Sequence, residues 1–501
     1  MVSIGIDLGT TYSCVAIVEN GRPHPINSED GDKNIIPSIV AFGEKEILVG
    51  NSALNCDIDL SNILYDSKRL IGCPILSDLP IADERQLWTF DVDTRNNSAG
   101  YVLNKGKPNE KFILPEEVSA KILKCLKDQA ERYTNQKVTK AVVTVPASFN
   151  ERQIVATKKA AEMAGLKVKD LLQEPTASIM AYMDKFKLRR SRIMVFDFGG
   201  GTLDICIAQI KQDGYELKAI TGDLHLGGQD FDSRIMRYVI DEFKKSSPDY
   251  DIYKKPKLVK RLRIECRKAK ESLSSSQYPV NVHLDINDEY EINVRLTKEK
   301  FNELCSDLFD KAMNLVERAT NTARISADQL NYVILVGGST RIPEIRQRLE
   351  NKFEKDRLKF DINPDEAVAH GAAIAANIPE KVCSTNPLMI DSKKFIGPDP
   401  PEWRDFASAA YFKGKLYYLG GKDPKTGEDT NRVDHIHYCN YGYSVIDYRD
   451  SIKIYRLSDD EREWIEVGEI PEERDSFGVA SLNGRIYITG GELKSLILCD
   501  K

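Results

Sequence analysis

Two stretches of the chain share one pattern of hydrophobic and polar positions: an apolar run, a turn of glycine and threonine, and a second apolar run. The first stretch is IGIDLGTTYSCVAIV at 4–18, and the second is IMVFDFGGGTLDICIA at 193–208. Short apolar runs bounded by turn residues are typical of buried strands. Each stretch therefore predicts a β-hairpin, and Asp7 and Asp197 occupy the same place at the end of the entering strand.

Around these stretches the pattern alternates between strands and helices. The run AVVTVP at 141–146 predicts a buried strand, and alanines at 156, 160, 161 and 164 predict a following helix that stops at Gly165. Residues 332–339 (YVILVGGS) predict another buried strand that runs into a glycine turn. This order of elements predicts an α/β chain with at least two lobes that contain parallel strands.

Composition limits the class of protein. A chain of 501 residues with 41% hydrophobic and 30% charged residues has the balance of a soluble globular protein, with room for about three domains. The net charge of −6 gives no general basic field, and the basic run at 254–263 has acidic neighbours. No apolar run reaches the ~18 residues of a membrane span. We therefore expect neither nucleic acid nor a membrane as a partner.

The N-terminus and the cysteines indicate a reducing compartment. The first residues lack the basic and apolar segments of a signal peptide. The ten cysteines are scattered singly without a CxxC pair, which argues against a zinc ribbon and against a disulfide scaffold. The expected location is the cytoplasm, with the nucleus as an alternative.

The two hairpins have the chemistry of a polyphosphate site. Glycine lets the backbone approach phosphate oxygens and direct N–H groups at them, and threonine hydroxyls add donors. An aspartate at each strand end can hold a hydrated Mg²⁺ ion, usually through its waters. Two ordinary hairpins with glycine turns are the alternative interpretation. The matched aspartates favour a pair of hairpins that grip one nucleotide from both sides.

Further motifs extend this pattern into a family resemblance. In order they are IGIDLGTTYSCVAIV (4–18), DSKRLIG (66–72), AVVTVPASFN (141–150), EPTASIMAY (174–182), FDFGGGTLDI (196–205), HLGGQDFD (225–232), LVGGSTRIP (335–343) and INPDEAVAHGAA (362–373). Residues 1 to about 379 thereby resemble the nucleotide-binding domain of the 70-kDa heat-shock chaperones, within the actin-like (ribonuclease H-like) ATPase fold. DLGTT alone also occurs in sugar kinases, whereas the last two motifs are far more specific to the chaperone branch. The resemblance implies ATPase lobe I at 1–184, lobe II at 185–379 and a linker at 380–400.

The resemblance also implies roles for individual residues. Lys68 would bring positive charge to the γ-phosphate and orient the attacking water. Asp7, Asp197 and Glu174 would surround Mg²⁺ and its waters, and Asp204 would help to bind a monovalent cation such as K⁺. The implied catalytic set is Asp7, Lys68, Glu174, Asp197 and Thr202. The implied ATP and ADP contacts are Gly9, Thr10, Thr11, Tyr12, Gly199, Gly200 and Gly201 at the phosphates, and Lys270, Ser274, Gly337, Gly338, Ser339, Arg341 and Asp365 at the adenosine, with Arg341 stacked on the purine.

Three departures from the family pattern change these expectations. Arg267 stands where the family usually has Glu, and Glu271 stands where animal members have Arg, which predicts weaker retention of adenosine, although the two residues can pair at i,i+4. The family has Tyr at Ser148, and at Ile154 it has an arginine that passes the nucleotide state to the substrate-binding domain. The loss of that arginine predicts absent or altered coupling. After Ile378 the sequence has neither the acidic, leucine-rich linker nor a recognisable peptide-binding sandwich.

The C-terminal segment 401–501 repeats a different pattern. Residues 404–421 and 474–491 each contain a strand, a Lys-Gly or Asn-Gly turn, a second strand and a Gly-Gly pair, which is hairpin chemistry. Together with Tyr455, Trp464 and PEER at 471–474, these units resemble kelch β-propeller repeats. They amount to about one and a half blades, whereas a propeller closes with four to eight. A small interaction module, a part of a larger assembly and a truncated or mispredicted gene fusion all remain as interpretations.

Three functions compete. The leading hypothesis is a Mg²⁺-dependent, chaperone-type ATP hydrolase, connected to protein folding and the stress response, with cochaperones or nucleotide-exchange factors as partners. The second is a non-enzymatic nucleotide-sensing scaffold whose C-terminal repeats bind a protein partner. The third is a sugar or small-molecule kinase, which the GGSTRIP motif and the lack of a sugar-recognition signal disfavour.

Overall fold

The computed structural model describes residues 2–28, 33–75, 85, 87–186, 188–212 and 214–378, together with the backbone of eight short strands between 408 and 499. The chain divides into two units, 1–378 and 379–501, which are described separately. The expected linker at 380–400 and the Gly-Gly pair at 420–421 lie outside the described residues. Among the residues that are described, no helix is long and apolar enough to cross a membrane.

The first large sheet of the 1–378 unit contains the first predicted hairpin. Its strand order is β12 (Lys167–Gln173), β11 (Val138–Val145), β1 (Val2–Asp7), β2 (Tyr12–Glu19) and β3 (Arg22–Pro25), and β4 (Ile35–Pro37) pairs with β2. Strands β1 and β2 are antiparallel with Asp7 opposite Cys14, whereas β1 and β11 are parallel with Ile4 opposite Ala141. The predicted hairpin at 4–18 and the predicted buried strand at 141–146 are confirmed.

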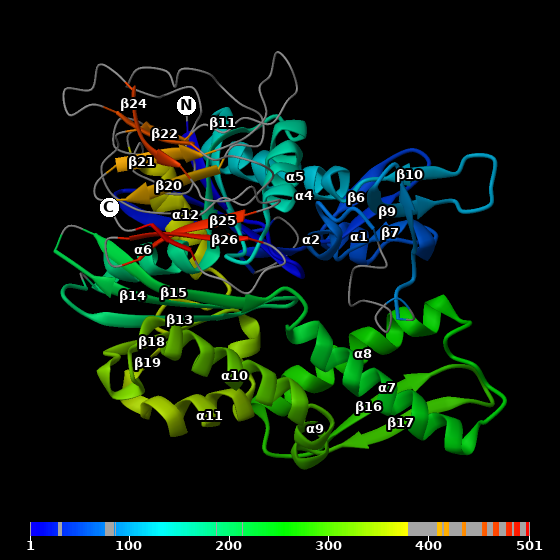
Figure 1. Ribbon diagram of the computed structural model, residues 1–501. Helices are drawn as coiled ribbons and strands as arrows, with labels where there is room; N and C mark the ends of the chain where they lie inside the picture. The colour runs from blue at the N-terminus through cyan, green and yellow to red at the C-terminus, as the bar shows by residue number, and fades with distance from the viewer. Residues whose placement is uncertain are drawn as a thin grey trace. The chain divides into compact units, whose positions relative to one another are not determined.

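The second large sheet contains the second predicted hairpin (Figure 1). Its order is β15 (Tyr215–Asp223), β14 (Leu203–Ile210), β13 (Arg192–Phe198), β18 (Tyr332–Val336) and β19 (Leu358–Lys359). Strands β13 and β14 are antiparallel with Asp197 opposite Asp204, and β13, β18 and β19 run parallel. Each sheet therefore combines one antiparallel hairpin with parallel strands, as the sequence predicts.

Helices accompany these two sheets, and most of them pack directly on one of the sheets. They are α4 (Pro115–Thr134), α5 (Glu151–Met163), α6 (Glu174–Phe186), α7 (Gly228–Ser246), α8 (Pro256–Ser275), α9 (Lys298–Leu304), α10 (Ser306–Ala323), α11 (Pro343–Phe353) and α12 (Ala367–Asn377). The predicted stop after α5 is confirmed, because Gly165 follows it with φ +72°. Helix α12 packs against β1 and α6. This approach is so close that a Cβ on Gly371 would lie 1.8 Å from the Ala177 carbonyl oxygen.

Smaller elements complete the unit. Strands β5 (Val40–Phe42), β6 (Ile47–Val49) and β7 (Ile63–Leu64) form one small sheet, and β8 (Asp91–Arg95), β9 (Ser98–Leu103) and β10 (Lys111–Ile113) form another. Short helices α1 (Asn51–Leu54) and α2 (Ser67–Leu70) lie near them, and the hairpin β16 (Val280–Asp285) and β17 (Glu291–Leu296) adjoins α7 and α8 (Figure 1). These elements flank the large sheets.

The apolar core consists of three main clusters. One fills the part of the unit around the first sheet, and a second surrounds α7, α8, α10 and the second sheet. The third contains Val142, Ala177, Val195, Ile334 and Ala372, and so joins strands of both sheets through α6 and α12. Each Å² of apolar surface that this shared cluster removes from water stabilises the fold by about 25 cal/mol. The cluster therefore stabilises the contact between the two sheets. It packs β11 and β12 of the first sheet against strands of the second sheet through α6 and α12.

In the 379–501 unit the described backbone consists of hairpins and short sheets. Strands β20 (Ser408–Phe412), β21 (Lys415–Leu419) and β22 (Val433–Ile436) form one sheet, β23 (Lys453–Leu457) pairs with β24 (Trp464–Glu469), and β25 (Phe477–Leu482), β26 (Arg485–Gly490) and β27 (Ile497–Cys499) form another. The two predicted hairpins correspond to β20–β21 and β25–β26, each antiparallel with a two-residue connection. The prediction of two β-hairpins in this segment is confirmed.

Candidate functional site

A cleft in the 1–378 unit collects most of the predicted site residues. Its cavity volume is about 550 Å³. It is lined by the two glycine turns, by one face of α8, by the turn after β18 and by the segment before α12. Every predicted site residue lines the cleft except Gly201 and Asp204. Residues that are scattered from 7 to 365 along the sequence are thus brought to one place.

The turns of the two hairpins touch each other. A Cβ on Gly200 would lie 2.0 Å from the Thr11 hydroxyl oxygen, and a Cβ on Gly201 would lie 2.6 Å from Thr10 Cγ2. The Gln229 side-chain amide also donates a hydrogen bond of 3.0 Å to the Thr11 hydroxyl. Gly201, which does not line the cleft, therefore serves the site by letting the turns meet. A side chain at either glycine would push the turns apart.

An acidic cluster lies beneath the turns. Lys68, on α2, forms an ion pair with Glu174 at the start of α6, and each side chain is 7% exposed. Asp7 accepts a hydrogen bond of 3.4 Å from the Thr144 hydroxyl. Asp197 and Asp204 are also buried. Four carboxylates and Lys68 thus lie together, and all of them except the half-buried Asp7 are buried.

The pKa values of these groups reflect the excess of carboxylates over positive charge in the cluster. Burial, and next the charge of Glu174, raises the pKa of Asp7 to about 7 and that of Asp204 to about 7. The same two causes raise the pKa of Asp197 well above its ordinary value. Burial alone would lower the pKa of Lys68, but Glu174 and Asp7 produce a net increase. Additional positive charge would stabilise this arrangement.

The cluster has the donors that a cation needs. One oxygen of Asp197 and one of Asp204 (Oδ2 in each) are buried, and neither has a hydrogen-bond partner among the described residues. A buried carboxylate oxygen without a partner is costly. Carboxylates are also the ligands that Mg²⁺ prefers, directly or through water. The residues therefore fit a cation bound between the two hairpins.

Asp204 has a neighbour that the family pattern lacks. The Ser148 hydroxyl donates a hydrogen bond of 3.1 Å to Asp204 Oδ1. Ser148 is one of the sequence departures, so the exchange places a small donor directly on a predicted cation ligand. Ile154, the other departure in this segment, packs against the apolar core, and Arg152 is exposed. Apolar packing thus replaces the arginine that the family pattern has at position 154.

Arg341 is fixed on the opposite wall of the cleft. Its guanidinium donates hydrogen bonds to Asp365 at 2.6 Å and to Asn363 at 2.9 Å. The Ser339 hydroxyl donates at 2.7 Å to the carbonyl of Gly199, which ties this wall to the second glycine turn. A planar cation held by two partners is well suited to stack on an aromatic base. Arg346, which also lines the wall, was not predicted from the sequence.

On the α8 face of the cleft, the ion pairs differ from the expected pairing of Arg267 with Glu271. Lys270 contacts Asp232 at 2.7 Å and donates to the Gly228 carbonyl at 2.7 Å. Arg267 contacts Asp232 at 3.4 Å, so its ion pair is with a buried aspartate on α7 and not with Glu271. Helical spacing predicted the i,i+4 pair, but a buried carboxylate attracts a neighbouring cation more strongly than an exposed one.

Several contacts across the cleft have no signal in the sequence pattern. Lys260 donates at 3.0 Å to the Leu54 carbonyl, and Arg263 donates at 2.6 Å to the Leu87 carbonyl. Both residues belong to the basic run at 254–263, which therefore joins α8 to the end of α1 at Leu54 and to the backbone at Leu87. Arg69 likewise contacts Asp230 at 2.9 Å. These long-range bonds hold the two sides of the cleft together.

Comparison with known proteins agrees with this geometry. A family model described as Hsp70 protein matches residues 3–391. The chain belongs to the Hsp70 family. Hsp70 relatives include "Heat shock cognate 70 kDa protein 3" of Dictyostelium discoideum, 40% identical over 75% of this chain and 60% of the relative, and "Heat shock 70 kDa protein BIP3" of Oryza sativa, 42% identical over 75% and 56%. The matched region thus spans less than two thirds of these Hsp70 relatives.

Proposed function

We propose that the chain is a Mg²⁺-dependent ATP hydrolase of the Hsp70 type. One observation carries the proposal: two matched hairpins place Asp7 and Asp197 beside the buried Lys68–Glu174 pair, at a cleft of about 550 Å³. This volume lies in the usual range for a small-molecule site. Membership of the Hsp70 family supports ATP as the nucleotide.

In this proposal the two turns bind the phosphates. Both turns and the residues Thr10, Thr11 and Thr202 line the cleft. Their backbone N–H groups and hydroxyls are proposed to donate hydrogen bonds to phosphate oxygens. Mg²⁺, held by Asp7 and Asp197 through water, supplies positive charge to the phosphates when bound. Asp204, with its unpaired oxygen, is proposed as a ligand for a monovalent cation such as K⁺.

Lys68 and Glu174 are proposed to act on the attacking water. Hydrolysis of a phosphoanhydride passes through a loose transition state, so positioning and charge supply most of the catalysis. Lys68 is held in one orientation by its buried ion pair, and it lies beside Asp7. From there its ammonium group orients the water and offsets negative charge at the γ-phosphate.

The adenosine side is proposed to hold the base weakly. Arg341 is oriented by Asp365 and Asn363 to stack on the purine. On the α8 side, Glu271 offers no planar cation to the base. Restoring the family residues in an Arg267→Glu/Glu271→Arg variant is expected to tighten ATP binding, and an unchanged affinity would count against this part.

The C-terminal segment is proposed to be kelch-like and to bind a protein partner. The support is the repeated hairpin design of β20–β21 and β25–β26. Ile154 supports altered communication between the nucleotide site and any partner, because its apolar side chain packs into the core. Capture of a specific partner by the full chain, lost when the chain ends at Ile378, would support this assignment.

The proposed activity is tested with Lys68→Ala. ATP binding and ATP hydrolysis are measured separately, with Mg²⁺ present. The proposal expects hydrolysis to fall by at least about a hundredfold, the usual scale for removing a charge-stabilising group, while ATP still binds. Lys124→Ala, an exposed lysine on α4, is the matched control. Hydrolysis that survives in Lys68→Ala would remove Lys68 from its role.

A further inference from the structure

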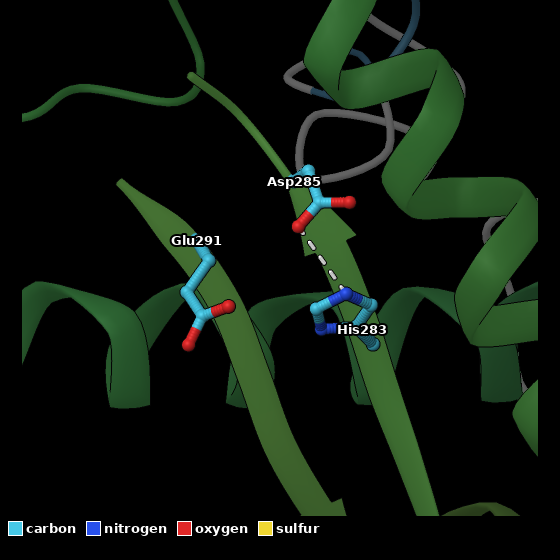
Figure 2. Close-up of side chains that lie close together, drawn as sticks. All are labelled: His283, Asp285 and Glu291. Carbon is cyan, nitrogen blue, oxygen red and sulfur yellow. Dashed lines mark ion pairs between the residues drawn. The ribbon is translucent and has the colours of Figure 1, made fainter. Parts of the chain in front are cut away.

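The hairpin β16–β17 carries a group of side chains that the nucleotide site does not use. Along β16 the buried Val282 and Leu284 alternate with the exposed His283 and Asp285. His283 and Asp285 therefore project from the same face of the hairpin. Glu291, at the start of β17, is paired directly with Asp285. Figure 2 shows the three side chains on this face of two neighbouring strands.

The distances suit a metal ion. His283 Nε2 lies 3.3 Å from Asp285 Oδ1. One ligand atom from each of His283, Asp285 and Glu291 can be chosen so that all lie within 4.8 Å of one another. Two ligands of a tetrahedral Zn²⁺ ion, each about 2.1 Å from the metal, are roughly 3.4 Å apart. The histidine and Asp285 already have this separation, and a carboxylate oxygen of Glu291 lies within 4.8 Å of both.

The charge pattern of the hairpin favours a bound cation. Asp285 and Glu291 are carboxylates directly opposite each other, an arrangement that destabilises an antiparallel pair. Arg295 is the cationic residue on the same face of β17, but it pairs with Asn281, four residues along the strand from Glu291. That separation is about 13 Å along a strand. Asp285 contacts His283, which lies on the same strand.

The other face of the hairpin supports the geometry. Helix α8 packs on β16, and α7 packs on β17. The inward residues Val282, Leu284 and Ile292 are buried, which fixes the register and so the outward positions. The three candidate ligands therefore project from a rigid scaffold into solvent, where water can complete the coordination.

We propose that this hairpin binds one transition-metal ion of the Zn²⁺ class through His283 Nε2 and the carboxylates of Asp285 and Glu291. Imidazole together with carboxylate suits Zn²⁺, Ni²⁺ or Cu²⁺, whereas Mg²⁺ and Ca²⁺ take oxygen ligands. None of the three residues lines the nucleotide cleft. The site is thus distinct from the proposed Mg²⁺ site, and it connects the ends of the two strands across the connection 286–290.

The test is titration of the tag-free full chain with ZnCl₂ in excess Mg²⁺, followed by calorimetry. The expected result is one equivalent of Zn²⁺ whose affinity falls at least tenfold in His283→Ala. Asn281→Ala is the matched control, because Asn281 is an exposed residue two positions away on the same strand face. It is expected to bind like the unchanged chain. Equal affinity in His283→Ala and the unchanged chain would overturn the proposal.

Co²⁺ separates this site from thiolate sites elsewhere in the chain. Nitrogen and oxygen ligands give only weak visible bands, whereas cysteine thiolates add strong near-ultraviolet absorption. Weak visible bands that disappear in both His283→Ala and an Asp285→Asn/Glu291→Gln variant are expected. Thiolate absorption that persists in both variants would place the metal on cysteines and would refute the assignment. ATP hydrolysis is expected to be unchanged in all these variants, so a failed proposed function and a failed metal site are distinguishable.

Discussion

Removing the charge of Lys68 should destabilise the nucleotide-free protein strongly. The Lys68–Glu174 pair is buried, with 7% exposure on each side, and Asp7 lies close enough to affect its pKa. Lys68→Met keeps most of the aliphatic stem but leaves a buried carboxylate without its cation. Breaking one side of a buried pair costs about 3–5 kcal/mol. We expect a loss in that range in the free energy of unfolding at pH 7.

A second substitution tests the cause of this loss. Adding Glu174→Gln to Lys68→Met removes the unpaired buried charge, and the double variant should recover at least half of the lost stability.

Urea denaturation without nucleotide or Mg²⁺ measures these effects. The fluorescence of Trp88, which is buried in the core around the first sheet, reports the unfolding when the other two tryptophans are replaced by phenylalanine. Lys124→Met, which removes an exposed i,i+4 pair with Asp128, is the control and should cost less than about 0.5 kcal/mol. A Lys68→Met variant that is as stable as this control would show that the buried ion pair does not stabilise the protein.

Three further predictions concern other parts of the 1–378 unit. Burial, and next the charge of Arg69, lowers the pKa of His225 to about 4, so the unfolded state binds more protons than the folded state between pH 6.5 and 4. Stability should therefore fall by about 2 kcal/mol as the pH drops from 7 to 4.5, and His225→Gln should remove that part of the slope in urea titrations; an unchanged slope would contradict it. Gly200→Ala would place a Cβ 2.0 Å from the Thr11 hydroxyl, so we expect ATP affinity to drop at least tenfold by calorimetry, and normal affinity would show that the turns do not bind phosphate. Arg341→Lys loses the forked contact with Asp365 and Asn363, so ADP affinity should fall about tenfold; equal affinity would exclude stacking by Arg341.

The sequence predicted the parts of the fold that rest on local patterns. The two hairpins at 4–18 and 193–208, the strand at 141–146 and the helix that stops before Gly165 are all present. Each has a continuous signal within a short window: an apolar run, a glycine turn, or alanines at helical spacing. The candidate site residues were assigned from the motifs of the family resemblance. The fold brings most of these residues to one cleft.

Features that depend on side chains far apart in the sequence were not predicted. Arg267 was paired with Glu271 by helical spacing, yet the fold brings it to Asp232 on another helix. The contacts of Lys260 and Arg263 with carbonyls of the other side of the cleft join residues 206 and 176 positions apart. No local pattern encodes such partners, because they arise only when the helices pack.

The Ser148 exchange was recognised from the sequence, but its consequence was not. Its hydroxyl reaches Asp204 Oδ1 at 3.1 Å, which ties the departure directly to a buried carboxylate. The His283, Asp285 and Glu291 group likewise has no recognisable spacing signal, since it depends on the register of two strands. Register is fixed by the buried face of the hairpin, which only the structure reveals.

Single-turnover hydrolysis of bound ATP by the full chain tests directly whether this protein is a Mg²⁺-dependent ATP hydrolase. ATP is bound first, Mg²⁺ is added, and the formation of ADP is followed with time in the unchanged chain and in Asp197→Asn. This substitution keeps the shape of the side chain but removes a carboxylate from the acidic cluster. We expect hydrolysis that requires Mg²⁺ and disappears in Asp197→Asn. ATP that stays intact in the unchanged chain, or hydrolysis that is equal in Asp197→Asn, would contradict it.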